Sequence, residues 1–203
     1  HSAAEIMAEL AFDWRHGVET TVPRELDTLA VSSPAVGDGV QYQGASPRAV
    51  AGLLAALPPE ARAARFIDFG CGKGRVLLLA AEAGFERLTG IEFAPALAAE
   101  ARRNLQRSRR VRPGIQAEVL TLDAAEYAIP TGPVALFFYN PFGGETLRRV
   151  VENVWKRANQ KKESLWIIYL NPKGLAVFEE AGFRIFKETR HREKVTGAIL
   201  VPL

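Results

Sequence analysis

The sequence contains a single cysteine, Cys71, among its 203 residues, so no disulfide can form within the chain. Such sparse use of cysteine is typical of proteins from reducing compartments. No apolar run approaches the ~20 residues that a membrane-spanning helix needs. The chain also shows no positively charged and then apolar leader with a small-residue cleavage site. We therefore expect a cytoplasmic protein that does not interact with a membrane.

Histidine is also scarce, and His16 and His191 are isolated in the sequence. No cluster of cysteine and histidine has the spacing of a zinc site, so we expect no metal ion. The net charge of +3 and the pI of about 9.2 are only mildly basic. A charge of this size permits an acidic partner without requiring one.

The remaining composition is ordinary for one globular domain, with 48% hydrophobic and 24% charged residues. A chain of this length can bury a full hydrophobic core. It contains neither an internal repeat nor a low-complexity tract. We expect an N-terminal extension over residues 1–41, which is a possible lid, and an α/β domain over residues 42–203.

The most informative stretch is FIDFGCGKGR, from Phe66 to Arg75, which precedes the apolar run Val76 to Ala81. Its apolar beginning predicts a buried strand, and the second apolar run predicts a helix directly after the turn. Glycine in such a turn allows positive φ angles and lets a ligand approach the main chain closely. The first turn of the helix offers free N–H groups to that ligand. The stretch therefore predicts a binding site for a small molecule.

The spacing of the glycines distinguishes two classes of cofactor. Dinucleotide sites have the pattern G-x-G-x-x-G, whereas Gly70, Gly72 and Gly74 form G-x-G-x-G, with Asp68 two positions before the first glycine. This pattern resembles motif I of the class I S-adenosylmethionine-dependent methyltransferases, D/E-x-G-x-G-x-G. The resemblance implies S-adenosyl-L-methionine as cofactor. It places the loop, with Cys71 in it, against the methionine part, which carries no pyrophosphate.

The second predicted strand, Leu88 to Phe93, carries Glu92 at its tip. Both cofactor classes place a carboxylate there to accept hydrogen bonds from ribose hydroxyls. Phe93, beside this carboxylate, is a further candidate for contact with the cofactor. Tyr42 precedes the helix that Ser46 and Pro47 are expected to open, and it could also reach the cofactor.

The third predicted strand, Ile115 to Leu122, ends just before Asp123. In class I methyltransferases an acidic residue after this strand accepts the adenine amino hydrogens, and the next main-chain N–H meets a ring nitrogen. The resemblance assigns these two roles to Asp123 and Ala124. A dinucleotide fold has no comparable need for a carboxylate at this place.

Alternating strands and helices indicate an α/β fold with a doubly wound, mostly parallel sheet. The expected strands are 65–69, 88–93, 115–122, 134–139 and 165–170, the intervening helices are 75–83, 95–109, 145–158 and 175–181, and two late strands are 183–186 and 195–201. The resemblance implies the seven-stranded Rossmann-like methyltransferase fold with strand order 3-2-1-4-5-7-6. In the extension we expect a short helix over residues 4–12, with Phe12 and Trp14 as packing anchors.

The fourth predicted strand runs into Asn140-Pro141-Phe142. An asparagine side-chain oxygen and a prolyl carbonyl can accept hydrogens from an amine, and a phenylalanine face can stabilise positive charge on nitrogen. Aligning the amine with the methyl group should supply most of the rate. The segment resembles the D/N-P-P-Y/F motif of amino-group methyltransferases, with one proline fewer. We predict these three residues as catalytic, with Asn140 also touching the cofactor.

The methyl acceptor is less well defined than the cofactor. The chain resembles a group of bacterial methyltransferase-like proteins, and its G-x-G-K-G-R element is similar to that of protein-lysine methyltransferases, which implies N-methylation of a protein side chain. An RNA or small-molecule acceptor, or a non-catalytic module that binds cofactor or nucleic acid, remains an alternative. A dinucleotide-dependent oxidoreductase would fit the fold but not Gly74, Arg75 or Asp123.

Six arginines suggest a partner for the nucleic-acid alternative. They are Arg102, Arg103, Arg107, Arg109, Arg110 and Arg112. Such a cluster can follow phosphates. A solvated helix face is the commoner explanation, because no aromatic residue within the cluster could stack on a base.

Overall fold

The computed structural model describes residues 3–21, 44–140, 142–160 and 163–203. Tyr42 and Pro141, both predicted site residues, lie outside these ranges. The elements are α1 (Ala3–His16), α2 (Pro47–Ala55), η3 (Pro59–Ala63), β1 (Arg65–Phe69), α3 (Arg75–Glu82), β2 (Arg87–Glu92), α4 (Pro95–Arg107), β3 (Gln116–Thr121), η4 (Ala124–Glu126), β4 (Val134–Phe138), α5 (Gly144–Gln160), β5 (Leu165–Leu170), α6 (Leu175–Glu180), β6 (Phe183–His191) and β7 (Lys194–Pro202).

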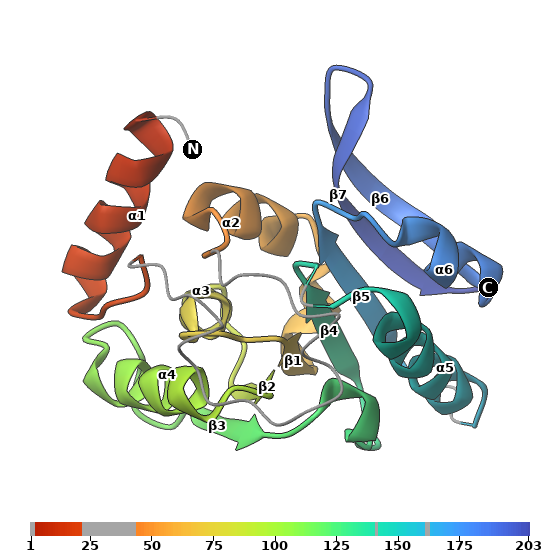
Figure 1. The fold of residues 1–203 in the computed structure, drawn as a ribbon, viewed down its shortest axis with the longest axis horizontal. Coiled ribbons are helices and arrows are strands. Elements are labelled where there is room, and N and C mark those ends of the chain that lie inside the picture. Colours follow the sequence, from red (N-terminus) through yellow and green to blue (C-terminus); the bar gives the residue numbers. More distant parts are fainter. Residues whose placement is uncertain (1–2, 22–43, 141, 161–162) are drawn as a thin grey trace.

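The seven strands form one sheet in the order β3-β2-β1-β4-β5-β7-β6 (Figure 1). Strands β1 to β5 are parallel, and β7 is inserted antiparallel between β5 and β6. This order confirms the predicted doubly wound sheet. The strand order reverses between β1 and β4, which is where open α/β sheets bind ligands.

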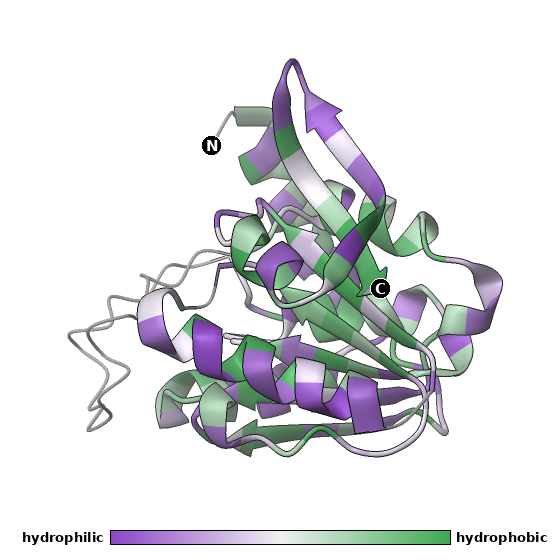
Figure 2. Cartoon of the chain, turned by 90° about the vertical axis from the view of Figure 1, so that its right-hand side faces the viewer, coloured by the Kyte–Doolittle hydropathy of each residue, from purple (hydrophilic) through white to green (hydrophobic). Residues whose placement is uncertain are grey.

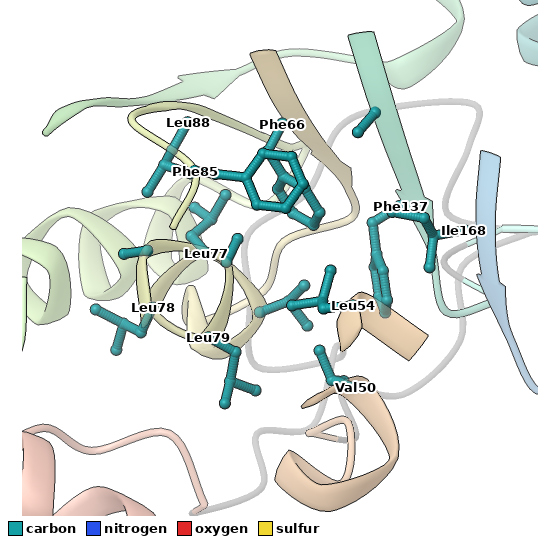
Figure 3. Close-up of a cluster of buried hydrophobic side chains, with 14 of the residues drawn as sticks. Val50, Leu54, Phe66, Leu77, Leu78, Leu79, Phe85, Leu88, Phe137 and Ile168 are labelled. Atoms are coloured by element: carbon teal, nitrogen blue, oxygen red, sulfur yellow. The ribbon is translucent and has the colours of Figure 1, made fainter. Parts of the chain in front are cut away.

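The central strands β1, β4 and β5 are apolar because helices cover both faces of the sheet. On one face, apolar side chains of α2 and α3 pack against the sheet, and on the other face α5 and α6 do so. Figure 3 shows the first cluster, with Val50, Leu54, Leu77, Leu78 and Leu79 from the helices and Phe66, Phe137 and Ile168 from the strands. In α5 the Trp155 side chain is 45% exposed, whereas Val151 and Val154 of the same helix are buried.

The hairpin of β6 and β7 is longer than the sequence predicted. The polar run from Lys187 to His191 was expected to be a connection, but it continues β6 as far as the turn at Arg192 and Glu193. Figure 2 shows that hydrophilic residues line the projecting end of this hairpin. Both faces of the ribbon meet solvent there, so its residues are polar and lack the alternation that identifies a half-buried strand.

Helix α1 is also longer than predicted, because it continues through the segment after Phe12 that was expected to be irregular. Phe12 is buried as expected, whereas Trp14 is 84% exposed and is not a packing anchor. The helix continues because His16, one turn after Phe12, is buried and stacks on its ring. It ends at Gly17, which has a φ of 72°. No helix in the described part of the chain is long and apolar enough to cross a membrane.

Candidate active site

The predicted site residues on β1 to β4 lie along one edge of the sheet. Asp68, Glu92, Asp123 and Asn140 lie at or just beyond the carboxyl ends of these four adjacent strands. Main-chain hydrogen bonds join neighbouring ends, since Leu122 N donates to Glu92 O at 3.1 Å. The topology therefore brings together residues that are 72 positions apart in the sequence, from 68 to 140.

The three glycines of the loop all adopt positive φ, at 75° for Gly70, 50° for Gly72 and 83° for Gly74. A β-carbon on Gly74 would lie 3.2 Å from the Ala101 side chain, so this glycine also permits close packing of α3 against α4. Two amides of the loop are already used within the protein, because Gly70 N and Cys71 N both donate to Ile91 O of β2. Such a loop presents its main-chain surface to a ligand and offers few free donors, as suits a ligand without a pyrophosphate.

Glu92 joins the loop to the end of β2. Its carboxylate accepts hydrogen bonds from Gly72 N and Ala94 N, both at 2.9 Å, and its side chain is only 4% exposed. Burial raises the pKa of Glu92, and the main-chain donors, including Phe93 N, partly oppose that rise. A carboxylate has about four acceptor sites, so Glu92 retains capacity for one further donor.

Asp68 is buried beside Glu92 at the end of β1, with 2% of its surface exposed. Its Oδ2 has no hydrogen-bond partner among the residues that the structure describes. Burial raises the pKa of Asp68 well above its usual value, and the charge on Glu92 raises it further. An orphaned buried carboxylate oxygen is costly for the folded protein. It is consistent with a site that is completed by a cationic ligand.

The predicted site residues also include Cys71, whose side chain turns away from the loop surface into the core. Its Sγ would lie 2.7 Å from a β-carbon on Gly90 of β2. Burial raises the pKa of the Cys71 thiol well above its usual value, and the charges of Asp68 and Glu92 raise it further. The thiol therefore stays protonated and unreactive, and only the main chain of this residue can face a ligand.

Asp123 caps the short helix η4, because its Oδ1 accepts a hydrogen bond from Ala125 N at 2.9 Å. The other carboxylate oxygen accepts no hydrogen bond from the residues that the structure describes, so it can receive a ligand at the edge of the sheet. The side chain is half-buried, and Ala124 behind it is buried. The predicted contacts of Asp123 and Ala124 with an adenine base stay predictions.

Asn140 lies in a strained turn with a φ of 43°, a left-handed conformation that asparagine tolerates better than most residues. Its Nδ2 donates to Asn171 O at 2.6 Å, and its Oδ1 accepts from the Tyr169 hydroxyl at 3.0 Å and from Lys173 N at 3.3 Å. Phe142 is half-buried and packs edge-on against Phe138. The Asn140 oxygen is thus already engaged by two donors within the protein.

Next to this turn, a pocket of about 310 Å³ opens at the ends of β4 and β5. It is lined by Glu5, Ser46, Ala49, Tyr139, Leu170, Asn171 and Thr196. Burial raises the pKa of Tyr139, as do the charges of Glu9 and Glu5, so its phenol stays protonated at neutral pH. Helix α1 therefore contributes a carboxylate to a pocket at the carboxyl end of the sheet.

Sequence reasoning missed the buried cations that flank Gly74. The Arg75 side chain is 2% exposed and forms an ion pair with Glu9 of α1 at 3.1 Å. Its guanidinium also donates to the hydroxyl oxygens of Thr20 and Thr21, at 2.7 and 3.0 Å, and to Ala45 O at 3.0 Å. One signal in the sequence could have revealed this. Arg75 is the first residue of helix α3, and the apolar residues that follow it indicate that this part of the helix is buried.

The segment that receives Arg75 is shaped by Asp13. Its carboxylate accepts hydrogen bonds from Thr20 N, Thr20 Oγ1 and Thr21 N at 2.5–2.9 Å. On the other side of Gly74, Lys73 is fully buried and forms an ion pair with Glu100 at 3.0 Å. The Arg75 contacts thus fasten the N-terminal helix to the glycine loop, and the Lys73 ion pair fastens α4 to it.

The buried carboxylate oxygen of Asp68, which has no partner in the described part of the chain, leads to a prediction for the stability of the folded protein. Its folded-state pKa lies above the unfolded value of about 3.9, so the folded protein holds more protons between the two values, and stability falls as pH rises through that window. We expect Asp68→Asn to remove much of this decline. At pH 7.5 it should raise the free energy of unfolding by more than the ~0.5 kcal/mol typical of neutral surface changes.

Urea unfolding of both proteins from pH 4 to 8, without added ligand, measures this difference. Asp123→Asn is the matched control, because the carboxylate of Asp123 is only half-buried. Parallel stability profiles for the wild type and Asp68→Asn would contradict the assignment of an unrelieved buried charge.

The Arg75 contacts predict that α1 depends on this one side chain. Arg75→Met removes one side of the buried ion pair with Glu9, and breaking a buried pair in this way typically costs about 3–5 kcal/mol. We expect amides of residues 3–16 to exchange hydrogen much faster, while those of β4 keep their protection. Hydrogen exchange read by mass spectrometry measures both segments. The control is Arg15→Met, since Arg15 is half-exposed and lies 3.9 Å from Glu82, and equal exchange in the two variants would refute the prediction.

A family model described as a methyltransferase domain matches residues 66–159, which include the glycine loop, Glu92, Asp123 and Asn140. No curated protein matches the chain in sequence.

Many solved structures share the fold. Magnesium protoporphyrin IX methyltransferase from Synechocystis PCC 6803, with bound S-adenosylmethionine, has 18% identity and a TM-score of 0.56, over 77% of each chain. Ribosomal protein L11 methylase from Lactobacillus delbrueckii subsp. bulgaricus has 13% identity and a TM-score of 0.57, over 79% of this chain and 80% of that one. The mitomycin 7-O-methyltransferase MmcR has 21% identity and a TM-score of 0.56, over 76% of this chain and 53% of that one.

Identities this low establish the fold and leave the acceptor open, because these proteins are named for a porphyrin, a protein and a small molecule. The sheet order, the G-x-G-x-G loop and the match to the methyltransferase domain agree with one another. The chain therefore contains a match to a methyltransferase domain over residues 66–159 and has the fold of enzymes that use S-adenosylmethionine as methyl donor.

Proposed function

We propose that this methyltransferase methylates nitrogen and that its acceptor is an amino group of a protein side chain. The observation that carries this proposal is the pocket at the ends of β4 and β5. Its volume of about 310 Å³ is at the lower end of the range for ligand sites. That size suits one extended side chain better than a porphyrin or another polycyclic ligand.

The chemistry of the pocket favours a basic group. The Glu5 carboxylate attracts a cation, and the protonated Tyr139 phenol and the Thr196 hydroxyl can accept hydrogens from an amine. Leu170 and Ala49 supply apolar surface for the methylene groups of a long side chain. A lysine side chain has this combination of an apolar stem and a basic tip.

The residues at the neighbouring strand ends fit the cofactor. The orphaned Oδ2 of Asp68 offers an acceptor to the ammonium group of the methionine part, and the spare acceptor capacity of Glu92 suits ribose hydroxyls. Asp123 and Ala124 would meet the adenine base. When bound, the cofactor supplies a methyl group on an activated sulfonium. The task of the protein is then to align an amine with that methyl group and to exclude competing water.

Asn140 can serve the reaction in two ways, by direct contact with the amine or by support of the pocket wall. Its oxygen can orient the amine directly, as the motif resemblance implies, or it can hold the 171–173 turn that forms one wall of the pocket. Direct contact would require one of its two donors, the Tyr169 hydroxyl or Lys173 N, to leave the oxygen. The Phe142 ring lies beside this turn and could stabilise positive charge on the amine.

Asn140→Ala is expected to abolish turnover and to leave the Kd for S-adenosylhomocysteine unchanged, because the side-chain contacts of Asn140 are with residues 169–173 on the acceptor side. A weaker Kd would instead support the predicted contact of Asn140 with the cofactor. Calorimetry and a methyl-transfer assay measure the two quantities. Tyr169→Phe then separates the two roles. It frees an acceptor position on Asn140 and also removes the hydroxyl that accepts from Gly174 N. A kcat that is kept or raised would therefore assign Asn140 to direct contact with the amine, whereas a fall in kcat would show that the turn must be held. Full turnover of Asn140→Ala would show that neither role is needed.

Identification of the acceptor tests the proposal itself. Protein extract incubated with the enzyme and an isotopically labelled methyl donor should gain label on lysine side chains, read by peptide mass spectrometry. With the labelled protein as substrate, Glu5→Gln should raise KM up to about fivefold, the effect of one exposed ion pair, without changing the affinity for S-adenosylhomocysteine. Label confined to RNA, or to small molecules, would overturn the protein acceptor.

A further inference from the structure

The loop after α4 concentrates positive charge on the surface. Arg107, Arg109, Arg110 and Arg112 are all exposed, within a stretch of six residues. None of the four forms an ion pair with a carboxylate in the described parts of the chain. Arginines that are not needed to balance the protein's own acids remain available to an anionic partner.

An exposed aromatic ring lies at the end of α1. Trp14 is the most exposed tryptophan of the described residues, with 84% of its surface accessible. The opposite side of the helix is buried through Phe12 and His16, so Trp14 points away from the body of the protein. A tryptophan with so little packing contributes little to the stability of the fold, and its free face can stack on another ring.

The structure joins these two features into one corner. His16 O accepts a hydrogen bond from Arg109 N, and His16 Nδ1 lies 3.0 Å from Ser108 Oγ. The Arg109 side chain packs against Gly17 just beyond the helix, because its Nε would lie 3.3 Å from a β-carbon there. In Figure 1 the loop after α4 lies directly below the C-terminal end of α1. Tryptophan and arginines distant in sequence therefore share one rigid surface.

We propose that this corner binds single-stranded nucleic acid. The surface, here called the Trp14–arginine corner, consists of Trp14, Arg15, Arg107, Arg109, Arg110 and Arg112. The sequence favoured a solvated helix face over nucleic-acid binding because no aromatic residue lies within the arginine cluster. The fold brings Trp14 to the cluster from another part of the chain. Exposed arginines that contact phosphates and a free aromatic face that stacks on a base are the two components of single-strand recognition.

An anionic membrane is the competing partner, because Ile6, Met7 and Leu10 of α1 are also exposed. Helices that lie on membranes carry lysine and arginine along their polar face. Among the exposed residues of α1 the only base is Arg15, and Glu5 opposes it. The positive charge lies at one end of the helix instead, in the neighbouring loop. This distribution fits a strand that crosses the end of α1 better than a surface that covers its length.

This inference does not depend on the acceptor proposed above, because the corner and the pocket are lined by different residues. The experiment therefore measures binding separately from methyl transfer.

The test uses the whole chain and a fluorescein-labelled 15-nucleotide oligouridylate, with anisotropy as the readout. We expect binding that weakens about 50-fold between 50 and 200 mM salt, as about four phosphate contacts to a single strand imply. Trp14→Ala should weaken binding by about 5- to 150-fold, the range for loss of one stacked base. Replacing both Arg109 and Arg110 by Ser should weaken binding and lower the salt slope by about 1.4.

Matched controls come from α5, at the opposite end of the molecule in Figure 1. Trp155 is partly exposed, and Arg148 and Arg149 are exposed. Trp155→Ala and the double change of Arg148 and Arg149 to Ser should leave binding and its salt slope unchanged.

Absent or salt-independent binding, or equal losses in the α1 and α5 variants, would overturn the proposal. So would a preference for phosphatidylglycerol vesicles that is lost in Leu10→Ser and kept in Trp14→Ala, since that result assigns the surface to lipid. Methylation of the bound oligouridylate would overturn the protein acceptor of the previous section and leave the nucleic-acid surface standing.

Discussion

The glycine loop is held from both sides by buried charges, and the rest of the site depends on that constraint. Glu92 accepts the amide of Gly72 on the sheet side of the loop. On the helix side, the buried guanidinium of Arg75 forms an ion pair with Glu9 of α1 and donates a hydrogen bond to the hydroxyl of Thr20. Glycines with positive φ are flexible on their own. Anchored at both ends in this way, the loop has one conformation, and a cofactor needs to spend little binding energy on ordering it.

The same anchoring explains why the N-terminal helix belongs to the site. Arg75 directly follows the loop in the chain. Any displacement of α1 would therefore break the buried ion pair between Arg75 and Glu9, which is costly. The helix is thereby kept beside the pocket at the ends of β4 and β5, to which it contributes Glu5. An extension of the chain, remote in sequence from the loop, thus forms part of the wall of this pocket.

The sequence predicted the sheet well because its strands are short apolar runs that end at polar residues. The segments 65–69 and 165–170 have the predicted bounds, and the others differ by a few residues at their ends. Glu92 and Asp123 could be placed for the same reason, since a residue that follows a parallel strand lies at the ligand edge whatever its partners are. Their detailed contacts could not be read from the sequence, because capping and loop hydrogen bonds involve atoms whose positions depend on several segments together.

The sequence-based predictions failed for residues whose burial does not follow from their polarity. Arg75 and His16 are polar yet buried, whereas Trp14 is apolar yet exposed, and a pattern of hydrophobicity misplaces all three. Asp68 is a different case. Its position in the motif predicted a place at the end of β1, but the sequence could not show that one of its carboxylate oxygens lacks a partner among the described residues. A buried carboxylate without a partner lowers stability, and a protein optimised only for folding would replace it with a neutral residue. Its presence beside a loop already fastened on both sides argues that the missing partner is the ligand, and that stability is given up here for binding.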